Sequence, residues 1–317
     1  MIITKSAKSI ILAALALAAM SAVPLFSSSY IVFLLNGIMV LALCSLSFNM
    51  VYANTGYMNL GNSMPFGVGT YALAIGLSRN WPATLAVVVS ILVVLFFAAL
   101  SGIFIVRLKN AYYAIGTLAL VLLAQALAYN LGWLTGGYQG LVVNVATGSA
   151  YSVYYILAFL NAVMLLLTIA IRKSSFGYRV RSIKGNEVVA STLGINVAVN
   201  KVIVLIAGSL FAGIAGILST FYNGFVTPES SFGISITFLP VIMAILLGSF
   251  SIAGPLIGVT IVALTLEIFA TTIPQLTHLV LGILLMLAAF YPKNFLTLKN
   301  SRFLKNRWGT SGTNSKN

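Results

Sequence analysis

Long apolar runs recur along the whole chain, and short polar stretches separate them. Most runs are about twenty residues long, the length that an α-helix needs to cross the roughly 30 Å hydrocarbon core of a bilayer. We predict ten membrane spans, over residues 9–26, 30–53, 60–78, 83–106, 112–131, 151–171, 202–222, 234–250, 253–272 and 276–291. The pattern predicts an all-α, polytopic transmembrane helical bundle that forms a single domain over residues 1–317.

The span at 60–78 has the weakest helical pattern. It carries Asn62, Pro65, Gly67, Gly69 and Gly76. We expect a broken helix there, because irregular backbone at membrane depth survives only where protein or a water-filled cavity satisfies the freed polar groups. A re-entrant loop is the alternative.

The first span, 9–26, also resembles a signal peptide, because Lys5 and Lys8 precede its apolar run. Cleavage there would leave nine spans. We expect an uncleaved helix, because no persuasive small-residue cleavage site precedes a soluble domain.

Composition and charge agree with a membrane protein and orient it. The chain is 60% hydrophobic and 6% charged, with a mean hydropathy of +1.07. Loops rich in Lys and Arg stay in the cytoplasm. With the N-terminus inside, all seventeen Lys and Arg residues except Arg79 fall on the cytoplasmic side. We therefore expect both termini in the cytoplasm, with the basic tail 293–317 acting as a topology anchor.

The residues that are scarce exclude several functions. The net charge of +14 does not indicate nucleic-acid binding, since it follows from having only three acids and many anchoring cations. One Cys and one His, Cys44 and His278, cannot form a metal site. No Lys follows a Gly, so the chain has no Walker-A loop for ATP. Glu267 and His278 make a poor proton relay, so a proton-coupled carrier has little support. We also expect no enzyme activity.

The longest polar stretch between spans is the loop 172–201, which the charge pattern puts in the cytoplasm. Asn186 suits the N-cap of a short helix, and Gly194 suits the left-handed position after it. Glu187 would then lie at the positive end of the helix dipole. Such a helix could dock into a groove on another protein, or it could lie on the membrane surface.

Small residues spaced four apart indicate close helix packing within the spans. They are Gly208, Ala212 and Gly216 in one span, and Gly254 and Gly258 in another. Several amides also fall in or near spans, where they need partners or a cavity. These are Asn36, Asn49, Asn54, Asn59, Asn62, Gln125 and Asn130. For a transport pathway we select Asn49, Asn54, Asn59, Asn62 and Gln125 as candidate lining residues.

Several stretches, covering more than half the chain in order, resemble one family. They are GYMNLGNSMPFGVGTYALAIG at 56–76, YYAIGTLALVLLAQALAYNLGWLTGGYQGL at 112–141, SSFGYRVRSIKGNEVVASTLGINVAVNKVIVLIAGSLFAGIAGIL at 174–218, and NGFVTPESSFGISITFLPVIMAILLGSFSIAGPLIG at 223–258. Together they resemble the permease subunits of branched-chain amino acid ABC importers, and specifically the M-type partner of the H/M permease pair.

The resemblance implies a bacterial inner-membrane importer for Leu, Ile and Val. The chain would pair with a homologous H-type permease, two cytoplasmic ATPase subunits and an extracytoplasmic binding protein. It would carry no cofactor itself, with ATP and Mg on the ATPases.

The resemblance also implies roles for residues of the 172–201 loop. The helix near Glu187 to Leu193 would be the coupling helix. Val189, Ala190 and Gly194 stand where ABC importers place their Ala-Ala-x-x-x-Gly motif, with Val189 replacing the first Ala. We expect ATPase docking to involve Arg179, Arg181, Asn186, Glu187, Val189, Ala190, Leu193 and Gly194.

The chain departs from the family in two places. The family has a more Gly-rich turn before its Gly-Pro pair than GSFSIAGPLIG, and a more acidic loop than this one, which keeps Glu187. Importers for urea, short amides and other amino acids share this architecture, so they remain alternatives. A stand-alone channel for a small neutral solute such as urea would fit the scarcity of acids and the many amides. A non-transporting scaffold would explain the packing residues but gives no reason for the coupling-like loop.

Overall fold

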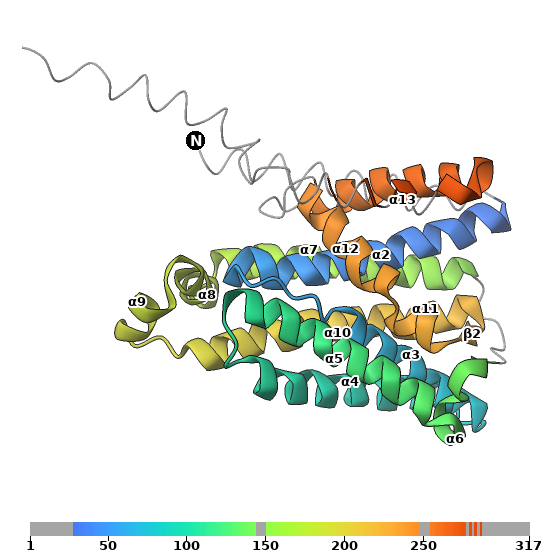
Figure 1. Cartoon of the computed structure of the whole chain (residues 1–317), viewed down its shortest axis with the longest axis horizontal. Coiled ribbons are helices and arrows are strands. Elements are labelled where there is room, and N and C mark those ends of the chain that lie inside the picture. Colours follow the sequence, from blue (N-terminus) through green and yellow to red (C-terminus); the bar gives the residue numbers. More distant parts are fainter. Residues whose placement is uncertain are drawn as a thin grey trace, which may run out of the picture. The chain divides into compact units, whose positions relative to one another are not determined.

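The computed structural model describes residues 28–143, 150–246 and 254–276, together with residues 279, 280, 282, 283 and 286. Nearly all of these residues lie in helices (Figure 1). The chain divides into two units, one ending at Leu264 and the other beginning at Thr265. The first unit contains every element described below, apart from the second half of α13 and the short helix η3.

The long helices, in chain order, are α2 (Ser29–Thr55), α3 (Ser63–Ser78), α4 (Ala83–Ile105), α5 (Asn110–Asn130), α7 (Ala150–Lys173), α8 (Ser175–Gly185), α10 (Val197–Asn223), α12 (Ile234–Leu246) and α13 (Gly254–Thr272). The short elements are α6 (Gly132–Thr135), η2 (Gly137–Gln139), β1 (Leu141–Val142), α9 (Glu187–Thr192), β2 (Phe225–Val226), α11 (Pro228–Phe232) and η3 (Pro274–Leu276). An all-α membrane bundle is confirmed.

Seven helical segments of the described chain are long and apolar enough to span a membrane: α2, α4, α5, α7, α10, α11 with α12, and α13. They match seven of the ten predicted spans, and the chain is a multi-pass membrane protein. The count is lower than ten because the segment 60–78 forms a helix of only 16 residues. The predicted spans 9–26 and most of 276–291 lie outside the described residues.

The predicted break in 60–78 is wrong in position, because α3 runs without interruption from Ser63 to Ser78. Pro65 falls in its first turn, where a missing N–H costs no helical hydrogen bond. The irregular backbone precedes the helix, at residues 56–62. Two glycines of α3 serve packing instead: a Cβ on Gly69 would overlap the carbonyl oxygen of Gly213, and one on Gly67 would overlap the Phe232 ring.

α2 and α10 form the centre of the first unit. α10 packs against α2, α3 and α4, and α2 also packs against α7 and α12. In the most apolar stretch of α2 and of α10, 67% of the residues are buried, compared with 22% in α4 and in α5. α4 turns one narrow stripe inward, and many of its residues are small and about four apart: Ala86, Ser90, Val94, Ala98, Ser101, Gly102 and Ile105. Its large side chains face outward, which suits a surrounding of lipid.

The two ends of the first unit differ (Figure 1). At one end α8 and α9 extend from the helices that flank them, α7 and α10. At the opposite end lie α6, β2 and α11. There β1 pairs with β2 in antiparallel fashion, with Leu141 opposite Val226. The end that carries α8 and α9 contains the residues predicted to couple to a partner.

Candidate functional site

The segment between α7 and α10 contains two helices. The predicted short helix is present as α9. The helix that precedes it, α8, was not predicted from the sequence. Local signals for α8 exist: the Ser174 hydroxyl accepts a hydrogen bond from the Gly177 backbone N–H at 3.1 Å, as an N-cap does. Val180 and Ile183, three residues apart, are buried on one face. α8 is therefore a packed helix with its own apolar side.

Both ends of α9 are closed by specific hydrogen bonds. At its start, Asn186 Oδ1 accepts from the backbone N–H groups of Val188 and Val189 at 2.9 and 3.3 Å. At its end, Gly194 has a φ of 79°, and the N–H of Ile195 donates to the carbonyl of Ala190 at 3.1 Å. This pattern is a Schellman motif. The capping roles predicted for Asn186 and Gly194 match this geometry.

α9 presents apolar side chains to the outside. Val188, Val189 and Leu193 are 65%, 54% and 72% exposed, whereas Ala190 is 1% exposed. Ala190 is buried in a cluster that includes Tyr57 of the turn 56–62. One side of α9 is therefore anchored to the helical bundle, and its opposite side is a small apolar surface on a rigid support.

Glu187 connects three separate parts of the chain at this end. Its carboxylate forms an ion pair with Lys201 of α10. The Tyr57 hydroxyl donates to Glu187 Oε1 at 2.6 Å, and Lys201 Nζ lies 3.8 Å from the centre of the Tyr57 ring. Only 6% of the Lys201 side chain and 17% of the Glu187 side chain are exposed. A shielded pair with this many partners fixes α9 to α10 and to the turn 56–62.

The surroundings of Glu187 keep it ionised. Burial raises the pKa of its carboxyl, but the hydrogen bonds from Lys201 and Tyr57 and the positive charges of Lys201 and Lys109 outweigh burial, so the pKa lies below its usual value. Burial and the same hydrogen bond to Glu187 raise the pKa of the Tyr57 hydroxyl, which stays a donor. The carboxylate is thus charged at neutral pH.

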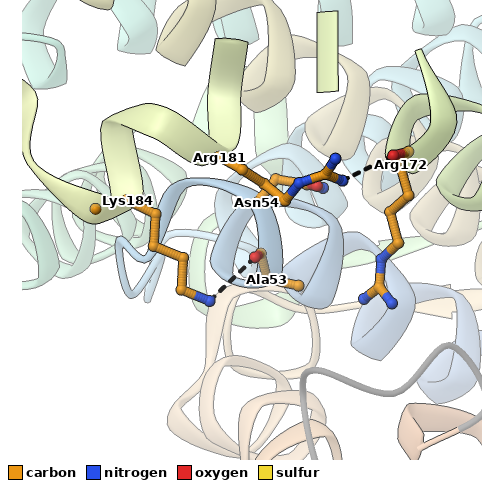
Figure 2. Close-up of a pocket in the computed structure, with 6 residues that line it drawn as sticks. Ala53, Asn54, Arg172, Arg181 and Lys184 are labelled. Carbon is orange, nitrogen blue, oxygen red and sulfur yellow. Dashed lines mark hydrogen bonds between the residues drawn. The ribbon is translucent and has the colours of Figure 1, made fainter. Parts of the chain in front are cut away.

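Two cations of α8 attach it to the ends of two long helices (Figure 2). Arg181 Nη1 donates to the carbonyl of Arg172 in the last turn of α7, at 2.9 Å. Lys184 Nζ donates to the carbonyl of Ala53 in the last turn of α2, at 3.2 Å. The last carbonyls of a helix have no partner within it and favour positive charge. Arg179, by contrast, is exposed, and its guanidinium lies 5.9 Å from the centre of the Phe176 ring.

Two of the predicted pathway amides, Asn59 and Asn62, satisfy the irregular turn before α3. Asn62 Nδ2 donates to the carbonyl of Cys44 at 2.8 Å, and Asn59 Oδ1 accepts from the N–H of Gly61 at 2.9 Å. Both are buried. Their hydrogen bonds stabilise the irregular segment between α2 and α3, and their role in a pathway stays a prediction.

The other three amides have different surroundings. Asn49 and Asn54 are buried on α2, and the side-chain oxygen of each has no hydrogen-bond partner among the described residues. Gln125 Nε2 donates to Glu229 Oε2 at 2.9 Å, joining α5 to α11. Asn54 and Asn59 line two different pockets of the described chain, and the place of these amides on a pathway likewise stays a prediction.

A cavity that the sequence did not reveal lies at the end opposite α9. It measures about 480 Å³, and residues of α2, α3, α10, α11 and α12 line it. Its polar groups are mainly hydroxyls, including Thr70, Ser219, Thr220 and Ser231, and none of the described residues that line it is charged. A sequence signal existed in the hydroxyl-rich stretch 219–231, but hydroxyls in membrane helices also bond to their own backbone and so indicate little by themselves.

The small residues predicted at helix contacts are all buried: Gly208, Ala212, Gly216, Gly254 and Gly258. A Cβ on Gly216 would overlap the carbonyl oxygen of Phe66 on α3, and one on Gly258 would overlap that of Met243 on α12. These glycines lie where two helix backbones approach each other closely.

Comparisons with known proteins find a matching family, a relative and a solved structure. The model of the family described as "Branched-chain amino acid transport system / permease component" matches residues 30–289. A protein of Methanocaldococcus jannaschii named "Probable branched-chain amino acid transport permease protein LivM" is 26% identical over 263 residues, which are 76% of this chain and 72% of that protein. The solved structure of PsaBC from Streptococcus pneumoniae in complex with Fab aligns over 89% of this chain and 99% of that chain, with 14% identity and a TM-score of 0.48.

Proposed function

Because the chain belongs to the family of branched-chain amino acid transport permease components, we propose that it is the M-type permease subunit of an ATP-driven ABC importer for Leu, Ile and Val. The family match, the relative named LivM and the multi-pass helical bundle support this role. The subunit performs no chemistry and forms one half of a translocation pathway.

The importer contains further subunits. A homologous H-type permease completes the pathway, two cytoplasmic ATPases bind ATP and Mg, and an extracytoplasmic protein delivers the amino acid. The assembly lies in the plasma membrane of a bacterium, with both termini of this chain and the α8–α9 end in the cytoplasm. The bias of Lys and Arg toward that side supports this orientation.

The α8–α9 segment couples ATP use to transport. The exposed face of α9, formed by Val188, Val189 and Leu193, docks into a groove on the ATPase. The observation that carries this proposal is the rigid attachment of α9: Glu187 holds it to Lys201 of α10 and to Tyr57. Movement of the ATPase therefore passes to α10 directly, and through α8 to the ends of α2 and α7.

The translocation pathway includes the uncharged cavity opposite α9. Its hydroxyls can bond to an amino acid that carries no net charge, and its apolar residues suit a branched side chain. Asn49, Asn54, Asn59, Asn62 and Gln125 remain candidates for the rest of the wall. The partner permease supplies the other half of the wall.

A pull-down of the tagged chain from native membranes tests the proposal. We expect two ATPases and a second permease to co-purify, together with a binding protein that can be titrated with Leu, Ile, Val and urea. If the binding protein binds urea tightly and none of the three amino acids, the substrate is a short amide. Recovery of the chain by itself would contradict the importer and favour a stand-alone channel.

A further inference from the structure

A pocket of about 610 Å³ lies between the ends of α2 and α7 and the helix α8 (Figure 2). Its lining residues are Ala53, Asn54, Arg172, Arg181, Lys184 and Gly185. Neither the family match nor the proposed coupling role assigns a ligand to this pocket. It forms because α8 crosses the helix ends at the points where Arg181 and Lys184 bond to backbone carbonyls.

The pocket is strongly basic. Six described residues line it, of which three are cationic and none is acidic. Like charges around one cavity repel each other, and an anion between them removes that cost. An Arg has five N–H donors, so the bond from Arg181 to the Arg172 carbonyl leaves it able to bind an oxyanion as well.

The position of the pocket indicates the source of the anion. Ala53 and Asn54 belong to the last turn of α2, and Arg172 belongs to the last turn of α7. Both helices are long enough to cross a bilayer, so their ends lie at the level of the lipid headgroups. Basic pockets between membrane helices at this level suit anionic headgroups.

We propose that this pocket binds a phosphate group and that the headgroup of an anionic phospholipid provides it. The lipid phosphate lies between Arg172, Arg181 and Lys184, while the acyl chains remain in the bilayer. A bound headgroup stabilises α8 against the ends of α2 and α7. The proposal rests on the pocket alone and holds whether or not the chain is an importer subunit.

Retention of lipid by the purified full chain tests the proposal. The chain is mixed with equal amounts of phosphatidylglycerol and phosphatidylcholine, and bound lipid is measured by native mass spectrometry. We expect phosphatidylglycerol to be preferred, and Arg181→Gln and Lys184→Gln each to weaken its binding about fivefold. Lys173→Gln is the matched control, because Lys173 is exposed beside Arg172 and does not line the pocket.

Conservative variants separate binding from folding. Lys184→Arg keeps the charge and the bond to the Ala53 carbonyl, so it should bind lipid like the unmodified chain. Comparison of Lys184→Arg with Lys184→Gln therefore tests the charge even if Arg181→Gln fails to fold. Equal weakening by Lys173→Gln would overturn the proposal, because it would mean a general surface charge effect. If inorganic phosphate displaces the bound lipid and phosphatidylglycerol is not preferred, the ligand of the pocket is a free anion and not a lipid headgroup. Unchanged lipid binding with impaired capture of an ATPase would make the pocket a protein contact.

Discussion

At the scale of single residues, the hydrogen bonds that the sequence predicts are the local ones. Asn186 and Gly194 could be identified as the two ends of α9 because an N-cap and a left-handed C′ glycine act within a few residues. The partners of Glu187 could not, because the Tyr57 hydroxyl is 130 residues away in the chain. Contact at that separation depends on how the helices assemble, and no local pattern encodes it.

Replacing Glu187 by Gln should destabilise the chain. The substitution leaves the buried Lys201 without its counter-charge, and breaking a buried ion pair in this way costs about 3 kcal/mol. Thermal unfolding of the detergent-purified chain measures the effect. Glu229→Gln serves as control, because Glu229 is an exposed carboxylate that accepts a hydrogen bond from the uncharged Gln125. Equal losses in the two variants would show that Glu187 contributes no more than a surface carboxylate.

The contribution of Glu187 should depend on pH in a defined direction. Its pKa in the folded chain lies below the ordinary value of 4.5, so its stabilisation is complete above that pH and is lost as the pH falls through the lower value. The difference in unfolding temperature between the unmodified chain and Glu187→Gln should be constant at neutral pH and should narrow on strong acidification. If the difference in unfolding temperature narrows between pH 8 and pH 6, a group other than Glu187 causes the pH dependence.

Substituting Gly194 tests the rigid end of α9. An added Cβ would meet no atom within 4 Å, but the φ of 79° strains an L-residue by roughly 1–2 kcal/mol. In the assembled importer, Gly194→Val should keep ATP hydrolysis and lose uptake, because a displaced α9 no longer transmits movement. Gly132→Ala is the control, since its Cβ has open space and its backbone φ is not positive. Normal uptake by Gly194→Val would remove the coupling role.

At the scale of helices, apolar length predicts the spans well and glycine predicts breaks poorly. Seven described spans follow from hydropathy alone. The predicted break in α3 is wrong because Gly67 and Gly69 lie at close contacts with other elements and do not interrupt the helix. Nothing within the sequence of α3 distinguishes a glycine that bends a helix from one that lets a neighbour approach.

An alanine scan of glycines separates these two roles. Gly69→Ala should destabilise the chain by about 1–3 kcal/mol, because its Cβ would overlap the Gly213 carbonyl of α10. Gly37→Ala on α2 should be neutral or stabilising by about 0.5–1 kcal/mol, because that Cβ has open space and Ala is the better helix former. The free energy of unfolding in detergent measures both. A stabilising Gly69→Ala would mean that α3 and α10 are further apart than described.

At the scale of the whole molecule, the chain should be inactive alone. An importer subunit contributes half of a pathway and no ATPase, so liposomes that contain only this chain should take up neither Leu nor urea. Adding the second permease and the ATPases should give uptake that requires ATP and the binding protein. Uptake of radiolabelled solute by the single chain without ATP would identify a channel.

The central place of α2 has a consequence for synthesis of the protein. Ser47 of α2 lies 2.6 Å from the carbonyl oxygen of Gly208, which follows it by 161 residues. A ribosome that adds about 5–20 residues per second needs roughly 8–32 s to make that interval. During this time the polar groups of α2 are in the membrane without α10. Until α10 has been translated, we expect the Ser47 hydroxyl to donate to Asn62 Oδ1, which lies 2.9 Å away and follows Ser47 by only 15 residues.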